Sequence, residues 1–215
     1  MAQEPAPRIH RRRSNVSGGT RDGIVAAAAE IFGQRGFGAS SVDEVAQQAG
    51  VTKATVYYHF SSKEELYAAV RVALLEQSTA QASESVQSYS DPLSALVHLV
   101  ELTISLTLDR SRKYMFFHEI VPISNEVRSA IGRAQRDYAV LLEQAVESGQ
   151  KAGVIRPGSP RIIVSLLLGA IARTTNWYND AGEMKPDAFS DLLCSMLLTG
   201  VVVGEGRKAL EKRKR

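Results

Sequence analysis

The strongest constraint on the fold is a run of three short helices in residues 20–60. Thr20 begins the first helix, in which apolar residues recur at helical spacing, and Gly33 to Gly38 end it. Ser41 followed by Glu44 is the pattern of a capping box, which opens the second helix. Three short helices this close together in the sequence predict a compact helical head.

The turn between the second and third helices has the form of a helix-turn-helix. Gly50 can take the left-handed conformation that ends the second helix, and Val51 can pack back into the small core. In the third helix, from Thr52, the side chains of Val56 and Phe60 lie one turn apart and are expected to be buried. The side chains left exposed are those of Lys53, Thr55, Tyr57 and Tyr58. Lysine can reach guanine or phosphate, a threonine methyl can meet thymine and tyrosine hydroxyls can bind phosphate, so the pattern predicts that this helix enters the major groove of DNA.

The segment 20–67 resembles the DNA-binding region of the TetR family of transcriptional regulators. The resemblance rests on Ala29-Glu30-Ile31-Phe32 to Gly36-Phe37, on Ser41-Val42-Asp43-Glu44-Val45-Ala46, on Ala49-Gly50-Val51, and on Thr55-Val56-Tyr57-Tyr58-His59-Phe60-Ser61-Ser62-Lys63-Glu64-Glu65-Leu66. It is specific, because a generic helix-turn-helix requires neither the aromatic cluster nor the Lys-Glu-Glu-Leu that follows. Thr55 departs from the family pattern, since many relatives have glycine or serine there.

The resemblance implies a set of DNA contacts. It implies base contacts from Lys53, Ala54 and Thr55, phosphate contacts from Tyr57, Tyr58, His59 and Lys63, and support from Ser40 and Ser41 at the start of the second helix. The alternative for the two tyrosines and the histidine is that they pack the head against the next helix. Asp43 and Glu44 would repel phosphate if they faced it, so we expect them to point away.

Beyond residue 63 the sequence predicts one helix after another and no convincing strand. The expected segments are Leu66 to Ser88, Pro92 to Leu108, Tyr114 to Val121, Asn125 to Gln150, Pro160 to Tyr178 and Lys185 to Val203. The predicted fold class is all-α, with about nine helices: a three-helix helix-turn-helix head joined to a larger helical body. The expected domains are a disordered basic arm (1–19), the DNA-binding head (20–67), an effector-binding and dimerisation body (68–204) and a basic C-terminal tail (205–215).

Positive charge is concentrated at the two ends of the chain. Residues 1–21 hold five arginines against one acid, and residues 205–215 hold six basic residues against two acids, in a chain whose net charge is only +3. Such ends favour contact with a polyanion such as DNA, or they serve as solubilising tails. No apolar run approaches the roughly 20 residues of a membrane span, and no secretory signal follows the basic start. We therefore expect a cytoplasmic protein with no membrane segment.

Two further features concern partners. The resemblance implies that the last two long helices pair with their copies in a second subunit, making a homodimer. Candidate effector-binding residues are polar or aromatic groups inside otherwise apolar helices, namely Tyr114, Phe117, His118, Asn125, Arg128, Arg173, Trp177 and Tyr178. The pair Trp177-Tyr178, followed by Gly182, is similar to TetR-like regulators of lipid and steroid breakdown, so the expected effector is an acyl-CoA or another bulky hydrophobic metabolite. Aromatic residues at helical spacing are also what an ordinary core contains.

An enzyme is not expected, and neither is a cofactor or a metal. The run Val201 to Gly206 lacks the second strand and the acid of a dinucleotide-binding loop, and His118-Glu119 lacks the second histidine of a zinc-binding helix. The predicted function is a dimeric repressor that binds a palindromic operator in double-stranded DNA and is released by its effector. The alternative is a TetR-like DNA-binding protein that recruits a protein partner and senses no small molecule. A hollow lined by His118, Arg128 and Trp177 would favour the sensor.

Overall fold

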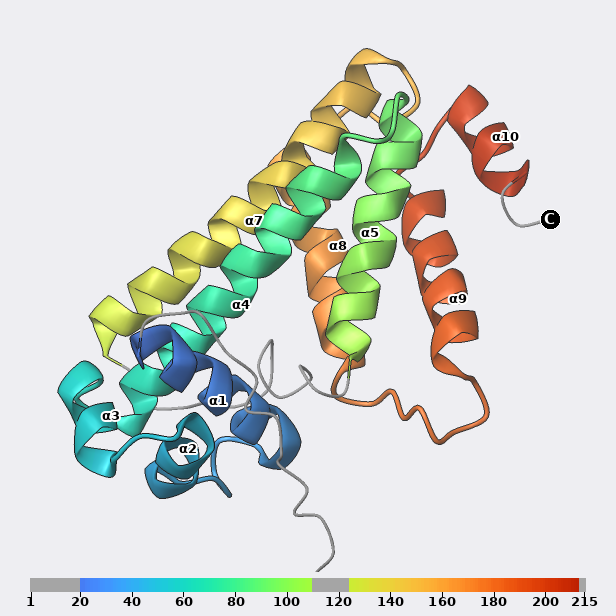
Figure 1. The fold of residues 1–215 in the computed structure, drawn as a ribbon. Coiled ribbons are helices and arrows are strands. Elements are labelled where there is room, and N and C mark those ends of the chain that lie inside the picture. The colour runs from blue at the N-terminus through green and yellow to red at the C-terminus, as the bar shows by residue number, and fades with distance from the viewer. Residues whose placement is uncertain (1–19, 110–123, 213–215) are drawn as a thin grey trace, which may run out of the picture.

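The computed structural model describes residues 20–109 and 124–212. Within these ranges the chain forms nine helices, which are α1 (Thr20–Arg35), α2 (Val42–Ala49), α3 (Lys53–His59), α4 (Lys63–Val86), α5 (Pro92–Leu108), α7 (Asn125–Lys151), α8 (Pro160–Thr174), α9 (Pro186–Thr199) and α10 (Glu205–Lys212). The only strand-like pairing in the described residues is one antiparallel bridge between Ile155 and Val202. Figure 1 shows a small helical head at one end of a longer helical body, which confirms the predicted fold class.

The head packs around one apolar cluster contributed by α1, α2, α3 and the start of α4. Ile24 and Phe32 of α1 are buried together with Val56 and Phe60 of the third helix. Tyr67 of α4 closes the cluster, with its ring edge-on to Phe32 at a centroid distance of 5.8 Å. The first turns of α4 are therefore part of the head.

The two longest helices, α4 and α7, run side by side from the head into the body (Figure 1). Near the head, Ala68 and Leu75 of α4 meet Ile131 and Ala134 of α7 in a separate apolar cluster. Farther along, α5 lies between α8 and α9 and packs against both (Figure 1). Of the helices in the described ranges, none combines the length and the hydropathy that crossing a bilayer would require.

Several helix ends differ from the predicted ones. Helix α8 stops at Thr174, where the hydroxyls of Thr174 and Thr175 each donate to a carbonyl of the preceding turn at 2.7 Å. Helix α9 stops at Thr199, because the backbone N–H of Val203 turns away to donate to the carbonyl of Val154 at 2.9 Å. Residues 205–212, expected only as part of a basic tail, form α10, whose Leu210 packs on the body core. The expected arm over residues 1–19 and the expected helix from Tyr114 to Val121 lie outside the described residues.

Candidate functional site

The turn between α2 and α3 has the predicted geometry. Ser41 caps α2 and forms a complete capping box with Glu44. Gly50 ends α2 in the left-handed conformation, with φ of 69° and its N–H directed to the carbonyls of Ala46 and Gln47. Val51 donates from its backbone to Ala46 at 3.0 Å and is partly buried against the head core. These contacts fix the angle at which α3 leaves α2.

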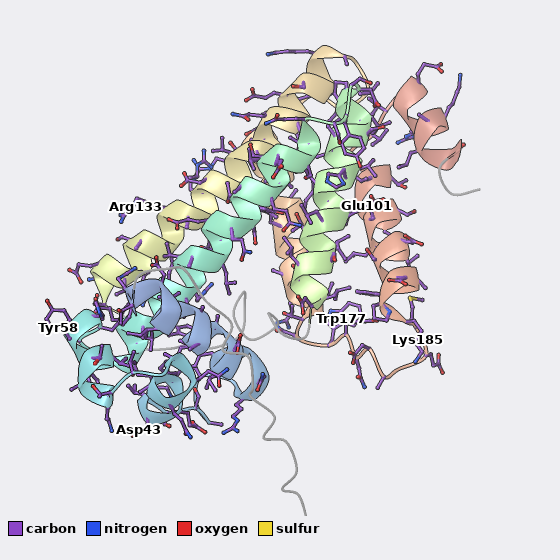
Figure 2. All side chains as sticks on the ribbon, in the orientation of Figure 1. Asp43, Tyr58, Glu101, Arg133, Trp177 and Lys185 are labelled. Atoms are coloured by element: carbon purple, nitrogen blue, oxygen red, sulfur yellow. The ribbon has the colours of Figure 1, made fainter. Side chains whose placement is uncertain are left out.

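Helix α3 divides cleanly into a buried face and an exposed face. Val56 and Phe60 are each 1% exposed, as the spacing predicted. On the other side Lys53 and Ala54 are exposed, Tyr57 is 45% exposed and Tyr58 is 85% exposed. Figure 2 shows Tyr58 at the outer edge of the head. The exposure of these two rings does not fit the alternative in which they pack the head against the next helix.

Two residues at the edges of this face are only partly accessible. The Thr55 hydroxyl lies 2.8 Å from the hydroxyl of Thr52, whose oxygen also caps α3 by accepting from the Thr55 N–H at 3.1 Å. His59 is half-buried, with its ring edge-on to Tyr58 at a centroid distance of 5.1 Å. Thr55 and His59 therefore border the exposed face of α3.

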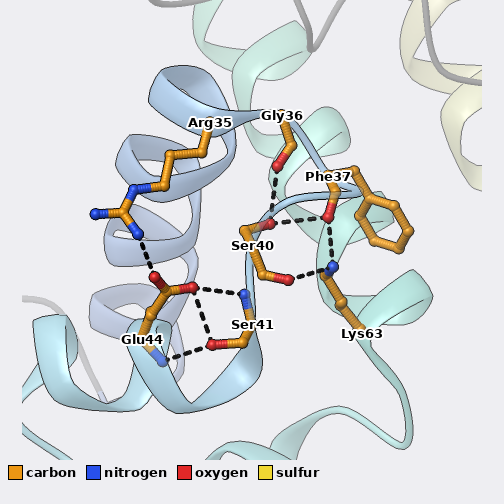
Figure 3. A network of polar contacts seen from close by, with 7 residues as sticks. All are labelled: Arg35, Gly36, Phe37, Ser40, Ser41, Glu44 and Lys63. Carbon is orange, nitrogen blue, oxygen red and sulfur yellow. Dashed lines mark hydrogen bonds and ion pairs between the residues drawn. The ribbon is translucent and has the colours of Figure 1, made fainter.

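Three of the residues predicted to contact DNA, or to support that contact, hold the α1–α2 turn together (Figure 3). The Lys63 ammonium donates to the carbonyl of Phe37 and, at 2.5 Å, to that of Ser40, and it lies over the Phe37 ring. The buried Ser40 hydroxyl forms hydrogen bonds of 2.9 Å with the carbonyls of Gly36 and Phe37. Ser41 is occupied by the capping box, so the structure gives these residues a role in placing α2.

The two acids of α2 behave differently from each other. Glu44 accepts from Ser41 and pairs with Arg35, and these contacts, led by the Ser41 hydrogen bond, lower the pKa of its carboxyl (Figure 3). Asp43 lies beside α3 instead. Its carboxylate reaches across the turn to Lys53, with 2.8 Å between Oδ2 and Nζ, and this hydrogen bond raises the pKa of the lysine.

The body contains a cavity of about 450 Å³ between α4, α5, α7 and α8. Its lining is mostly apolar with a few hydroxyls, and it consists of Leu75, Ser78, Thr103, Leu106, Thr107, Gly132, Gln135, Arg136, Tyr138, Ala139, Ser165, Leu168, Gly169 and Ala172. The hydroxyls of Ser78, Thr103 and Thr107 each donate to a carbonyl four residues earlier in their own helices. Because a hydroxyl can also accept, these groups leave acceptor capacity at the wall.

The candidate effector residues named from the sequence lie elsewhere or outside the described residues. Tyr114, Phe117 and His118 are not among the described residues. Asn125 and Arg128 are exposed in the first turns of α7, Arg173 lies in the last turn of α8, and Trp177 and Tyr178 follow the end of that helix. Trp177 is labelled in Figure 2. The Tyr178 ring stacks on Phe189 at 4.0 Å between centroids, and Trp177 meets the same ring edge-on. These five residues do not line the cavity. The sequence did not reveal the cavity, because its walls are mainly small and hydroxylated side chains from four helices.

A second, larger groove of about 1080 Å³ lies between α1, α4 and the start of α7. Five carboxylates line it, those of Asp22, Glu30, Glu65, Glu76 and Glu126, against one arginine, Arg21. An acidic wall repels anions and is costly to desolvate against an apolar ligand. The cavity in the body is the better candidate for a small hydrophobic molecule.

Large apolar side chains stand exposed on both α8 and α9. Ile162 and Leu166 of α8 are 62% and 70% exposed, and Leu192 and Met196 of α9 are 44% and 67% exposed. Other apolar residues of these two helices, such as Leu167 and Phe189, are buried in the subunit itself. Exposed apolar residues in this number are typical of an interaction surface.

Comparisons with known proteins agree with this architecture. The sequence pattern of bacterial regulatory proteins of the tetR family matches residues 24–70, and that of the tetracyclin repressor-like C-terminal domain matches residues 89–201. The chain is 27% identical over 181 residues to the HTH-type transcriptional regulator YhgD of Bacillus subtilis (strain 168), covering 83% of this chain and 94% of the relative.

Solved structures share the fold. The transcriptional regulator FadR from Bacillus subtilis in complex with stearoyl-CoA superposes with a TM-score of 0.71 at 24% identity, covering 83% of this chain and 98% of that one. AibR in complex with isovaleryl coenzyme A and operator DNA superposes with a TM-score of 0.67 at 24% identity, covering 82% and 97%. With both domain patterns matched in order along one chain, this protein belongs to the TetR family, whose members are DNA-binding transcriptional regulators and not enzymes.

Proposed function

We propose that this regulator is a ligand-released repressor that acts in the cytoplasm, where bacterial DNA lies. Residues 20–67 bind a palindromic operator in double-stranded DNA, and residues 68–204 form the homodimer and hold a small effector. The observation that carries the sensor part is the cavity of about 450 Å³ in the body. A preformed hollow of this kind favours a metabolite sensor over a DNA-binding protein that recruits a protein partner and senses nothing.

The exposed face of α3 supports the DNA contacts of this proposal. Lys53, Ala54 and Thr55 are at the start of the helix, the part of a recognition helix that reaches base edges. Tyr57 and Tyr58 follow one turn later on the same exposed face, where their hydroxyls can bind phosphates. Ser40, Ser41 and Lys63 contribute by fixing α2, and His59 borders the contact.

Regulators of this family are dimers, and the exposed apolar residues of α8 and α9 support these two helices as the interface. A two-fold dimer brings the same surface of each subunit together, so Leu166 and Met196 would be covered by their counterparts. The dimer would carry two α3 helices, which must lie about 34 to 36 Å apart to enter successive major grooves. A change in that spacing changes operator affinity.

The proposed effector is an acyl-CoA or another bulky hydrophobic metabolite. The apolar lining of the cavity suits an acyl chain. Arg136 at its wall is half-exposed and pairs with Glu143 at 2.9 Å, and its remaining N–H groups suit a negatively charged group such as a phosphate of coenzyme A. The complexes of FadR with stearoyl-CoA and of AibR with isovaleryl coenzyme A support the same class. In this proposal the cavity residues bind the acyl part, in place of the candidates at the end of α8.

Helix α4 is the proposed mechanical connection between the effector cavity and the DNA-binding head. Its Tyr67 and Val70 are buried in the head core, and its Leu75 and Ser78 line the cavity about two turns farther on. An effector that displaces the cavity part of α4 would move the head with it. Linkage requires that the effector weaken operator binding by the same factor by which the operator weakens effector binding.

The test is a titration of the full-length dimer into DNA flanking its own gene at two salt concentrations, with stearoyl-CoA, isovaleryl-CoA or free coenzyme A added. We expect salt-sensitive binding that an acyl-CoA releases and coenzyme A alone does not. Ala172→Phe, which fills the cavity, should keep DNA binding and lose release, whereas Ala152→Phe, on the exposed end of α7, should behave like the unmodified protein. Tight binding that no acyl-CoA or lipid disturbs would count against the sensor, and no binding to any DNA would count against the whole proposal.

A further inference from the structure

Asp43 lies at the exposed start of α2, beside the first residue of α3. Its side chain is 65% exposed, that of Lys53 is 51% exposed, and the two form an ion pair of 2.8 Å. Figure 2 shows Asp43 at the outer edge of the head. The lysine that it holds is the only lysine or arginine of α3, so Asp43 neutralises the one full positive charge on that helix.

Stability does not account for this arrangement. An ion pair between two well-exposed side chains contributes little to the free energy of unfolding. The capping of α2 is performed by Ser41 and Glu44, and Glu44 already supplies an acid in the first turn. The pair lies instead on the part of the head that faces DNA in the proposed function. There the pairing changes DNA affinity, because a carboxylate repels phosphate and a lysine attracts it, and each weakens the effect of the other.

We propose that Asp43 is a specificity-determining residue that positions Lys53 for DNA bases. A free lysine is a flexible point charge that binds any nearby phosphate, and such contacts carry no sequence information. By holding the ammonium at the start of α3, Asp43 keeps it from the phosphates and aims it at the groove, where guanine N7 and O6 can accept from it. Asp43 thus lowers the affinity for DNA of arbitrary sequence and preserves the affinity for the operator. A group that disfavours the wrong sequences raises specificity in this way.

The experiment compares full-length dimers with single substitutions. A randomised duplex library first selects the preferred sequence of each dimer, and affinity is then measured for that duplex and for a scrambled duplex of the same composition over a range of salt. The variants are Asp43→Asn, Asp43→Ser, Lys53→Gln and the double variant D43N/K53Q. The control is Glu84→Gln, which removes an exposed acid near the far end of α4, about 30 Å along the helix from its first residue, Lys63.

We expect Asp43→Asn and Asp43→Ser to bind scrambled DNA about three- to tenfold more tightly, with a salt slope steeper by about one as Lys53 gains a phosphate. The preference at one position in each half-site should weaken, so the ratio of specific to non-specific affinity falls. In a protein that already carries Lys53→Gln, Asp43→Asn should change neither the ratio of specific to non-specific affinity nor the slope of affinity against salt. Glu84→Gln should match the unmodified protein throughout.

Two results would overturn the inference while leaving the regulator intact. In one, both Asp43 variants keep the specificity ratio and the sequence preference of the unmodified protein. In the other, Asp43→Asn has the same effect with and without Lys53, which would mean that the acid acts only through bulk charge. If the unmodified protein selects no sequence at all, the DNA-binding role of the head fails, and the inference fails with it.

Discussion

The side-chain hydroxyls of Thr103 and Tyr138 lie 2.8 Å apart where α5 and α7 form the wall of the body cavity. Thr103 already donates its proton to the carbonyl of Leu99 at 2.6 Å, so the shared hydrogen bond is donated by Tyr138. Both side chains are buried. Burial raises the pKa of Tyr138.

Tyr138→Phe should lower the free energy of unfolding by about 1 kcal/mol at neutral pH, because it removes the donor of a buried hydrogen bond. The raised pKa means that the folded protein keeps Tyr138 neutral where an unfolded tyrosine ionises. Its contribution is therefore fully present below about pH 10 and is lost as the pH rises further. Urea unfolding at about pH 8 and about pH 10.5 checks this: the difference between the two proteins should shrink at the higher pH, and an unchanged difference would contradict the assignment.

Lys63 and Lys53 should give opposite results on truncation to alanine. Lys63→Ala removes the donor to the carbonyls of Phe37 and Ser40, so we expect a loss of about 1 to 3 kcal/mol in stability. Lys53→Ala breaks only an exposed ion pair and should leave the melting temperature almost unchanged while weakening DNA binding. Thermal melts and DNA titrations of both variants separate the roles. A Lys63→Ala protein that melts normally and loses DNA affinity would restore the phosphate contact implied by the family resemblance.

Much of the head was predictable because its signals are local. The capping box of Ser41 and Glu44 and the left-handed Gly50 each depend on a few neighbouring residues, and the structure confirms them. The ion pair of Asp43 with Lys53 was not predicted, since it depends on the angle between α2 and α3, which no single stretch of sequence encodes. The contacts of Lys63 were not predicted either, because the carbonyls that it binds lie 23 and 26 residues earlier in the chain.

The cavity could not be predicted for a related reason. It arises where small or hydroxylated residues of four helices meet, such as Ser78, Thr103, Gly169 and Ala172, and none of them is conspicuous alone. A search for aromatic and charged residues selected Trp177 instead. That residue is 62% exposed, and its ring meets Phe189 outside the cavity.

Leu166→Glu and Met196→Glu should each shift the protein from dimer to monomer. Both side chains are more than half exposed in the isolated subunit, so the substitutions should leave its fold intact while placing like charges against each other across a two-fold interface. Analytical ultracentrifugation should show the monomer, and operator affinity should fall at least tenfold as the second α3 is lost. Gln144→Glu adds the same charge on the exposed surface of α7 and should remain dimeric. Dimers that persist in both α8 and α9 variants would exclude these helices as the interface.

Gly50→Ala isolates the conformational requirement of the helix-turn-helix turn. An added Cβ meets nothing within 4 Å, so any destabilisation comes from the positive φ of 69° and should be about 1 kcal/mol. Gly23 is the matched control: it also has open space around a Cβ but lies inside α1, where alanine should instead stabilise by up to about 1 kcal/mol. Denaturant titrations of the two variants should therefore move in opposite directions. Because the strain at residue 50 bears on the angle between α2 and α3, Gly50→Ala should also weaken DNA binding, and Gly23→Ala should not. If both variants shifted the same way, the left-handed turn would not be what sets the position of α3.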